Sequence, residues 1–573
     1  MHIVQRKYSP STALALSRSG ASPLLARVWA ARGIRNLSDV KGKVGDLIPY
    51  EELTNAVAMA EILADAIVAR KKLLIIADYD ADGATACTVG LRALKAYGAD
   101  VDSLIPDRME HGYGLTDGIV DMAANLPRKP DIIITVDNGI SNVAGVKHAM
   151  KLGMQVLITD HHLPGDEAPP ALKIVNPNQH GCDFPAKSLA GCGVIWYVMW
   201  ALKDVMAKRG IPQADPTFKI ASLLPIVAVG TIADVVALER NNRILVSEGL
   251  RFIHNGVSFA GIDALAKVAG KDARALTCAD VGFGIGPHIN AAGRLASMDA
   301  GVACLMTDSL QAADVWAKEL HEKNMERRLI EAKIVDEAVL QLLTMVQPDA
   351  YTAVLHADEW HHGVIGIAAS RVKDRIYRPT FVMASGKNGE VKGSGRSIIG
   401  FHLRDALDMV HKRNPGLLPK FGGHAMAAGV TVCAGGLQRF REAFEEVAHE
   451  LLSPSLLNQQ LETDGSLEAM EMNLSTVAQI KSQVWGQGFQ EPAFADEFKV
   501  LSAKKIGKDE KTLKLKVEKG GIAFDAVKFK HEGLDIPERV RMVYKLDANT
   551  FSPFGGRPKD PELQLLVDHV EPA

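Results

Sequence analysis

The chain has 573 residues, too many for one hydrophobic core, and at ~100 to 200 residues per domain this length predicts three or four domains. Its apolar content of 47% and charged content of 23% are those of an ordinary globular protein. The formal net charge of −3 excludes a basic surface over the whole molecule. Any surface for nucleic acid must therefore be local.

Cysteine usage and hydropathy predict a cytoplasmic protein without membrane association. The six cysteines are scattered and form no CxxC pair, which favours reduced thiols over a disulfide framework. Residues Met1 to Lys7 lack the apolar stretch of a signal peptide. The most apolar window, residues 193–202, is closed by Lys203 and is shorter than the ~20 residues that span a bilayer.

Residues 1–45 are expected to form an irregular lead-in with one short helix around residues 22–32. Residues 46–255 then alternate apolar runs with segments of helical spacing. The runs lack polar alternation, which is typical of strands buried on both faces. They are residues 73–77, 101–105, 132–136 and the segment ending at Thr159, and helical spacing covers 84–97, 115–124 and 142–152. Strands that alternate with helices predict a parallel sheet covered on both sides.

Acidic residues and histidines follow these apolar runs. Their positions are Asp78, Asp80 and Asp82 after the first run, Asp107 after the second, Asp137 after the third, and Asp160, His161 and His162 after the fourth. In parallel sheets of this type ligands bind at the carboxyl ends of the strands, so these side chains are expected to converge on one edge. A fifth acid in a comparable setting, Asp234, comes after the apolar segment 223–229.

Five of these residues make a mixed oxygen and nitrogen ligand set that suits a pair of divalent cations: Asp80, Asp82, Asp137, His161 and Asp234. Carboxylate oxygens with one imidazole favour Mn²⁺ or Mg²⁺ over zinc. Two such ions can clamp a phosphodiester for hydrolysis. The set predicts a metal-dependent hydrolase of phosphate esters.

Each member alone also has a structural explanation. An acid at a strand end is usually a helix cap or a turn former, and Asp102 and Asp107 are interpreted in that way. Asp78 lies nearer its strand and suits a supporting hydrogen-bond acceptor. Adjacent histidines also occur in surface turns, but the combined set favours a metal site.

The rest of the sequence predicts a helical connector, a second α/β unit and a β-barrel. Residues 256–345 are expected to be a helical connector, with one long, partly exposed helix over 309–345 that contains no glycine or proline. Residues 346–450 form a second α/β unit. Residues 453–573 are expected to form a β-barrel, since residues 511–517 alternate strictly and place Lys514 and Lys516 on one face. Residues 499–519 hold eight lysines and three acids, a local net charge of +5. This basic segment suits the binding of single-stranded nucleic acid, or its lysines only solvate an exposed strand.

Four motifs carry a resemblance to the DHH phosphoesterase superfamily. They are DYDADG at 78–83, VDNGIS at 136–141, TDHHLP at 159–164 and GTIADV at 230–235. Within the superfamily the chain resembles the bacterial single-strand-specific exonucleases, through PDRMEHGYGL at 106–115, NAAGRL at 290–295, HHGVIGIAASR at 361–371, GSGR at 393–396 and FGGHA at 421–425. The resemblance covers nearly the whole chain.

The resemblance implies a parallel-sheet DHH domain, a long helix, a smaller DHHA1 domain and an OB-fold around a groove for one strand. It implies processive 5′-to-3′ degradation of single-stranded DNA to 5′-mononucleotides with two Mn²⁺ or Mg²⁺ ions, in DNA recombination and repair. Single-strand-binding protein, a helicase and mismatch-repair proteins are the implied partners, and the enzyme is expected to be a monomer. Polarity and exclusion of duplex follow from the resemblance alone.

The resemblance also implies residue roles. The five residues of the ligand set would hold the metals, with Asp78 and Asp160 supporting them and His162 facing the scissile phosphate. The implied contacts to DNA phosphates are Arg108, His288, Arg294, Ser394, Arg396 and His424, with Lys514 and Lys516 on the barrel. Position 288 departs from the family, which usually has arginine there. Because histidine is mostly neutral at pH 7, it would bind a DNA phosphate more weakly than arginine does. The variant His288→Arg is therefore expected to bind DNA more tightly at pH 8.

Two other interpretations stay open at this point. A DHH phosphodiesterase of short oligonucleotides or cyclic dinucleotides would need no basic β-rich end. A catalytically dead DNA-binding scaffold would have lost metal ligands, and every expected ligand is present.

Overall fold

The computed structural model describes residues 1–107, 111–345, 349–507, 510–531, 536–550 and 560–573. Its first domain contains a five-stranded, all-parallel sheet in the order β3-β2-β4-β5-β6. The strands are β2 (Lys72–Ala77), β3 (Asp100–Leu104), β4 (Ile132–Val136), β5 (Gln155–Thr159) and β6 (Lys173–Val175). The predicted parallel sheet is confirmed, and β6 is a strand that the sequence pattern did not indicate.

Helices cover both faces of this sheet because the central strands are buried on both sides. Leu74 and Ile76 of β2 pack with α6 (Asp117–Ala124) and α7 (Val143–Lys151) on one face. Leu73 and Ile75 pack on the other face with α3 (Ala56–Val68), α4 (Ala81–Tyr97) and α8 (Gly191–Lys208). Every position of β2 is buried, which explains why its sequence does not alternate between apolar and polar residues.

The segment 223–229 differs from its expected setting at a strand end. It lies in a helix, α9 (Leu224–Ala233), which is buried along most of its length and starts with Pro225 in its first turn. Asp234 is therefore the C-cap of a helix. A short, fully apolar run has no periodicity that separates a buried strand from a buried helix.

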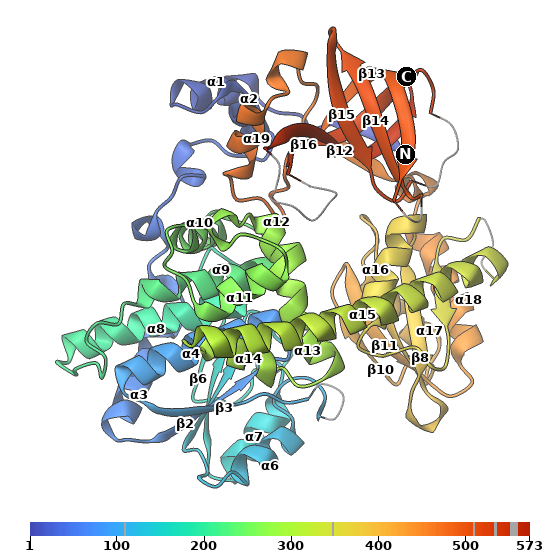
Figure 1. The fold of residues 1–573 in the computed structure, drawn as a ribbon. Helices are drawn as coiled ribbons and strands as arrows, with labels where there is room; N and C mark the ends of the chain where they lie inside the picture. The colour runs from blue at the N-terminus through green and yellow to red at the C-terminus, as the bar shows by residue number, and fades with distance from the viewer. Residues whose placement is uncertain (108–110, 346–348, 508–509, 532–535, 551–559) are drawn as a thin grey trace.

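A helical region follows and ends in the long helix that the sequence predicts. Its elements are α10 (Arg240–His254), α11 (Ala260–Val268), α12 (Cys278–Asp280), a π-helical turn (Val281–Ile285), α13 (Gly286–Leu295), α14 (Asp299–Met306) and α15 (Leu310–Met345). In Figure 1, α15 runs from the first domain across to the second. This helix joins the two α/β units as a single rod.

The second α/β unit is a mixed five-stranded sheet in the order β10-β11-β9-β8-β7. Its strands are β7 (Ala353–His356), β8 (Thr380–Ser385), β9 (Val391–Arg396), β10 (Lys420–Gly423) and β11 (Ala427–Val432), and its helices are α16 (Ile365–Ile376), α17 (Leu403–Arg413) and α18 (Leu437–Leu451). The two glycine motifs of the sequence lie on β9 and β10.

The C-terminal part is a closed five-stranded barrel in the order β13-β14-β15-β17-β16. Its strands are β13 (Phe494–Ile506), β14 (Thr512–Lys519), β15 (Ile522–Lys528), β16 (Arg539–Asn549) and β17 (Glu562–Pro572). On β14, Leu513, Leu515 and Val517 are buried and Lys514 and Lys516 are exposed, as the alternation predicts.

The N-terminal segment is more ordered than the irregular lead-in that was expected. It contains β1 (His2–Gln5), α1 (Pro10–Arg18) and α2 (Pro23–Ala30), and β1 pairs in parallel with β12 (Gln460–Thr463). Figure 1 shows α1 and α2 beside α19 (Leu474–Lys481), close to the barrel. A pairing between strands more than 450 residues apart leaves no local sequence pattern.

Two smaller expectations concern thiols and membranes. The six cysteines are free thiols, and five of them are buried. Among the residues described, none of the helices has the length and apolarity needed to cross a bilayer.

Candidate metal centre

The register of the parallel sheet brings the predicted ligands together. Ala77, Val136 and Thr159 are successive partners across β2, β4 and β5, so the chain leaves all three strands at one level. Single ligand atoms then approach within 4.8 Å of one another in three groups. The groups are Asp137 with His161 and His162, Asp82 with His161 and Asp234, and Asp78 with Asp80 and Asp137.

Two helix N-termini fix the first pair of acids. Asp80 caps α4, and its Oδ1 accepts hydrogen bonds from the N–H groups of Asp82 and Gly83 at 2.9 and 3.0 Å. Asp82 is fully buried and accepts from the N–H groups of Gly191 and Cys192, at the start of α8, at 2.6 and 3.0 Å. A helix N-terminus stabilises a carboxylate, which keeps Asp82 ionisable in the interior.

Close backbone packing surrounds the central acid, Asp137. Its φ of 61° lies in the left-handed region, which stores strain in a residue with a side chain. A Cβ at Gly191 would lie 2.7 Å from both Cβ and Oδ1 of Asp137. Glycine at 191 is therefore required by the position of this carboxylate, a constraint that the sequence analysis missed.

Asp160 positions the two histidines rather than facing the ligand cluster. Its carboxylate accepts from the N–H groups of Ile140, His161 and His162 at 2.9, 2.7 and 3.1 Å, and its Oδ1 lies 2.8 Å from Nδ1 of His162. The ring of Tyr113 packs edge-on against His162, with centroids 5.9 Å apart. These contacts orient the imidazole of His162.

The electrostatics are those of an anionic cluster. Burial, and then repulsion by the other acids of the cluster, raises the pKa of Asp137 and Asp234 well above the usual value, and burial also raises that of Asp82. Burial lowers the pKa of His161. For His162 burial also favours the neutral form, but the bond to Asp160 and nearby carboxylates outweigh it and raise its pKa to about 9.

Several buried polar atoms in this cluster lack hydrogen bonds to the residues that the structure describes: Oδ1 of Asp137, Nε2 of His161 and Oδ2 of Asp234. Nε2 of His161 lies 3.1, 3.5 and 3.9 Å from oxygens of Asp137, Asp234 and Asp82. Burying such atoms is costly unless a partner compensates them. Carboxylate oxygens with one neutral imidazole fit Mn²⁺ or Mg²⁺ as that partner.

The NAAGRL motif supports the cluster from α13. Oδ1 of Asn290 accepts from the N–H of Ala81 at 2.9 Å. A Cβ at Gly293 would lie 1.7 Å from the carbonyl oxygen of Tyr79. The helix therefore packs directly against the backbone of residues 78–83, here called the ligand loop. Nη1 of Arg294 donates to the carbonyl of Gly363 at 3.0 Å and links this helix to the second α/β unit.

Part of the expected phosphate-binding set lines a cleft of about 1090 Å³ between the two α/β units. Tyr79 and Tyr113 form one side, and Ser394 lies on the other with β9, β10 and β11. Nη1 of Arg396 donates to Oγ of Ser394 at 3.1 Å. Burial, and then repulsion by His162, lowers the pKa of His424, so the two imidazoles lie near enough to interact electrostatically.

The other predicted contacts have different surroundings. Lys514 and Lys516 lie on the exposed face of β14, and Lys514 is 3.5 Å from Asp525. Arg108 lies outside the described residues. His288 is only 3% exposed, with Nδ1 2.6 Å from the carbonyl of Gly284 and Nε2 3.1 Å from Nδ1 of His321. Both ring nitrogens are thus engaged inside the protein, which does not favour the expected phosphate contact, and that contact stays a prediction.

Comparison with known families agrees with this architecture. Residues 72–231 match the DHH family, N-terminal domain, residues 349–450 match the DHHA1 domain, and residues 463–557 match the RecJ OB domain. An acidic centre at the strand ends of the first domain, followed by a DHHA1 domain, defines a DHH phosphoesterase.

Relatives that align along nearly the whole chain identify the family within the DHH phosphoesterases. The chain is 41% identical to the single-stranded-DNA-specific exonuclease RecJ of Escherichia coli (strain K12) over 96% of both chains. It is 32% identical to RecJ of Bacillus subtilis (strain 168), covering 95% of this chain and 67% of the relative. The Mn²⁺ complex of RecJ from Thermus thermophilus has a TM-score of 0.81, with 27% identity over all of this chain and 79% of that structure. The chain belongs to the RecJ family.

Proposed function

We propose that this protein is a single-strand-specific DNA exonuclease that removes 5′-mononucleotides in the 5′-to-3′ direction by two-metal phosphodiester hydrolysis. The buried cluster of acids and one neutral imidazole, with unsatisfied ligand atoms, is the observation that carries the proposal. The family supports the substrate, since the relatives are single-stranded-DNA-specific exonucleases.

The proposed metal ligands form the five-residue set of the sequence analysis: Asp80, Asp82, Asp137, His161 and Asp234. Asp78 supports the cluster, because one of its carboxylate oxygens belongs to the group with Asp80 and Asp137. Two bound ions would activate a water for attack and stabilise the charge on the departing oxygen.

Asp160 and His162 act on the scissile group without holding a metal in this proposal. Asp160 accepts from Nδ1 of His162 and so leaves Nε2 to face the substrate. With a pKa near 9, His162 holds a proton at neutral pH, and an imidazolium bonds strongly to a phosphate oxygen.

The polarity of digestion would come from an anchor for the 5′ end across the cleft. Ser394 lines the cleft and Arg396 donates to its hydroxyl. Together with the imidazole of His424 they would offer groups for a phosphate. Glycines beside Ser394 and His424 would let a strand approach the backbone. Lys514 and Lys516 would hold the emerging strand on the barrel. The link from Arg294 to Gly363 supports a role for Arg294 in fixing the two walls of the cleft.

The domain division proposed is 1–45, 46–255, 256–345, 346–450 and 453–573. Partners such as single-strand-binding protein, a helicase and mismatch-repair proteins, a monomeric state and a cytoplasmic location stay predictions. So does the preference between Mn²⁺ and Mg²⁺, although relatives have been solved with either ion.

The decisive experiment is a nuclease assay with Mn²⁺ on an oligonucleotide labelled at its 5′ or its 3′ end, beside the matching blunt duplex. Immediate release of labelled mononucleotide from the 5′ label alone, with the duplex resistant, is expected. Asp80→Ala should keep DNA binding and lose cleavage. Hydrolysis of dinucleotides with no action on longer strands would instead assign the protein to the short-oligonucleotide phosphodiesterases.

A further inference from the structure

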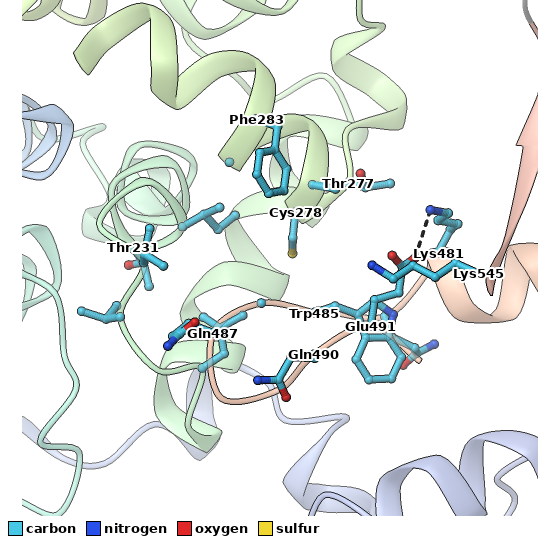
Figure 2. A pocket seen from close by; sticks show the side chains of 18 residues that line it. Thr231, Thr277, Cys278, Phe283, Lys481, Trp485, Gln487, Gln490, Glu491 and Lys545 are labelled. Atoms are coloured by element: carbon cyan, nitrogen blue, oxygen red, sulfur yellow. Dashed lines mark ion pairs between the residues drawn. The ribbon is translucent and has the colours of Figure 1, made fainter. Parts of the chain in front are cut away.

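A second cavity, of about 400 Å³, lies on the barrel side of the metal centre. One wall comes from the end of α9 and the loop after it, including Thr231 and Val235. The opposite wall is the loop of residues 483–491, which includes Trp485. Figure 2 shows the ring of Phe283 above this cavity, with Trp485 and Gln490 on the opposite side. Asp234, a proposed metal ligand, lies in the sequence between Ile232 and Val235, which both line the cavity. This wall therefore belongs to the same segment as the proposed metal site.

Phe283 is the most exposed large apolar side chain around this cavity, with 82% of its surface accessible. It lies in the π-helical turn before α13, between Gly282 and Gly284. A Cβ at Gly282 would lie 3.4 Å from Ile232, and one at Gly284 would lie 3.5 Å from Ala269. The flanking glycines therefore pack inward, and the turn directs the phenylalanine ring outward. π-Helical turns occur frequently at functional sites.

Val235 provides an independent sign of function at the same place. It directly follows the proposed ligand Asp234, is 62% exposed and has a φ of 64°. A β-branched residue in the left-handed region is a true conformational outlier, and such strain gathers at functional sites. One exposed apolar residue is ordinary by itself. Two of them at the mouth of one cavity, each on an unusual backbone, indicate a ligand with an apolar face.

The opposite wall is rigid and offers polar groups. The N–H of Leu238 donates to the carbonyl of Gln487 at 2.8 Å, which fixes this loop to the catalytic domain. The side-chain amides of Gln487 and Gln490 are exposed at the cavity and make no hydrogen bond to the described part of the chain. Amide groups can pair with the edges of a base whose face is stacked on an aromatic ring.

We propose that this cavity receives one nucleobase of the substrate strand, on the barrel side of the scissile phosphodiester, with Phe283 as its stacking surface. The inference rests on the proposed exonuclease function and adds a site for the strand between the metal centre and the barrel. A volume near the lower end of the ~300–1,000 Å³ of ligand pockets suits a single base rather than a run of the strand.

Phe283→Ala tests the proposal through release of the first nucleotide from a single-stranded oligonucleotide. Stacking of a base on an aromatic side chain corresponds to a factor of about 5 to 150 in affinity. We expect kcat/KM to fall by a factor in that range, and Phe283→Trp to keep most of the activity. Leu343→Ala is the matched control, because Leu343 is 78% exposed on α15, away from the cavity.

A series of strands, each with one abasic site, separates stacking from a general loss of activity. In the wild type, one abasic position should reproduce the loss caused by Phe283→Ala, and that position should have no further effect in the variant. Equal kcat/KM for Phe283→Ala and wild type, or equal sensitivity of both to every abasic position, would overturn the inference while leaving the exonuclease function intact. A wild-type protein that releases no nucleotide would instead refute the function on which it rests.

Discussion

Asp234→Asn should stabilise the metal-free protein and at the same time remove its response to Mn²⁺. Asp234 caps the C-terminus of α9, where a negative charge opposes the helix dipole. Its Oδ2 is buried and makes no hydrogen bond to the described residues. Asparagine keeps the size of the side chain and removes its charge.

The gain can be worked out from the group that Asp234 forms with Asp82 and His161, whose ligand atoms lie within 4.8 Å of one another. Two unit charges at that separation repel by about 1 kcal/mol in bulk water and by about 3 kcal/mol at an effective dielectric constant of ~20. The helix dipole adds ~0.3 to 1 kcal/mol. We therefore expect the free energy of unfolding in EDTA at pH 8 to rise by about 1 to 4 kcal/mol.

The pH dependence has a defined sign. Because the pKa of Asp234 is raised in the folded protein, its ionisation begins to destabilise the fold above the ordinary pKa of 3.8 and does so fully above the folded pKa. The difference between variant and wild type should thus be largest at pH 8 and shrink as the pH falls towards 4. An exposed acid of α15, Asp336, gives the control Asp336→Asn, which should change little.

The assay is thermal unfolding in EDTA and in excess Mn²⁺. A ligand at 100 times its Kd stabilises a fold by about 2.7 kcal/mol, and the wild type should gain on that scale while Asp234→Asn gains little. A variant that melts below the wild type in EDTA would refute the electrostatic reasoning. An unchanged Mn²⁺ response would refute the assignment of Asp234 as a ligand.

Three further substitutions probe other parts of the structure. Gly191→Ala should displace the Asp137 carboxylate, since the new Cβ would lie 2.7 Å from it, and a Mn²⁺ titration should show at least a tenfold weaker affinity. Asp160→Asn removes a charge that helps to hold the pKa of His162 near 9, so the alkaline fall in kcat that accompanies loss of the imidazolium should move to lower pH. Asp464→Asn breaks a buried ion pair and should cost about 3 to 5 kcal/mol, measured by thermal unfolding and by faster proteolysis of the N-terminal segment.

The sheet and the cluster of acids and histidines at its edge could be predicted because a few local patterns determine them. A strand buried on both faces must be apolar at every position, as in β2, and the acids that follow it in the sequence must leave the sheet at its carboxyl edge. The same reasoning failed for the element before Asp234, because a buried helix can be equally apolar. It identified Asp234 as a candidate ligand and misassigned the element that carries it.

Contacts between distant segments could not be predicted. The role of Gly191 depends on how closely α8 approaches Asp137, and the burial of His288 depends on His321 of α15. Neither approach follows from spacing along the chain. The NAAGRL motif was visible in the sequence, but its contacts to the backbone of the ligand loop required the fold.

Contacts between distant segments also explain the structural role of the N-terminal segment. Arg32, just after α2, makes a buried ion pair with Asp464 at 2.6 Å, donates to the carbonyl of Gln490 at 2.8 Å and lies 5.4 Å from the ring of Trp485. Trp485 and Gln490 belong to the loop that forms one wall of the cavity beneath Phe283. The first residues of the chain therefore fix a wall that lies between the metal centre and the barrel. Breaking the ion pair between Arg32 and Asp464 should therefore slow the cleavage of long strands more than the hydrolysis of dinucleotides. Only a long strand would reach from the metal centre to the barrel.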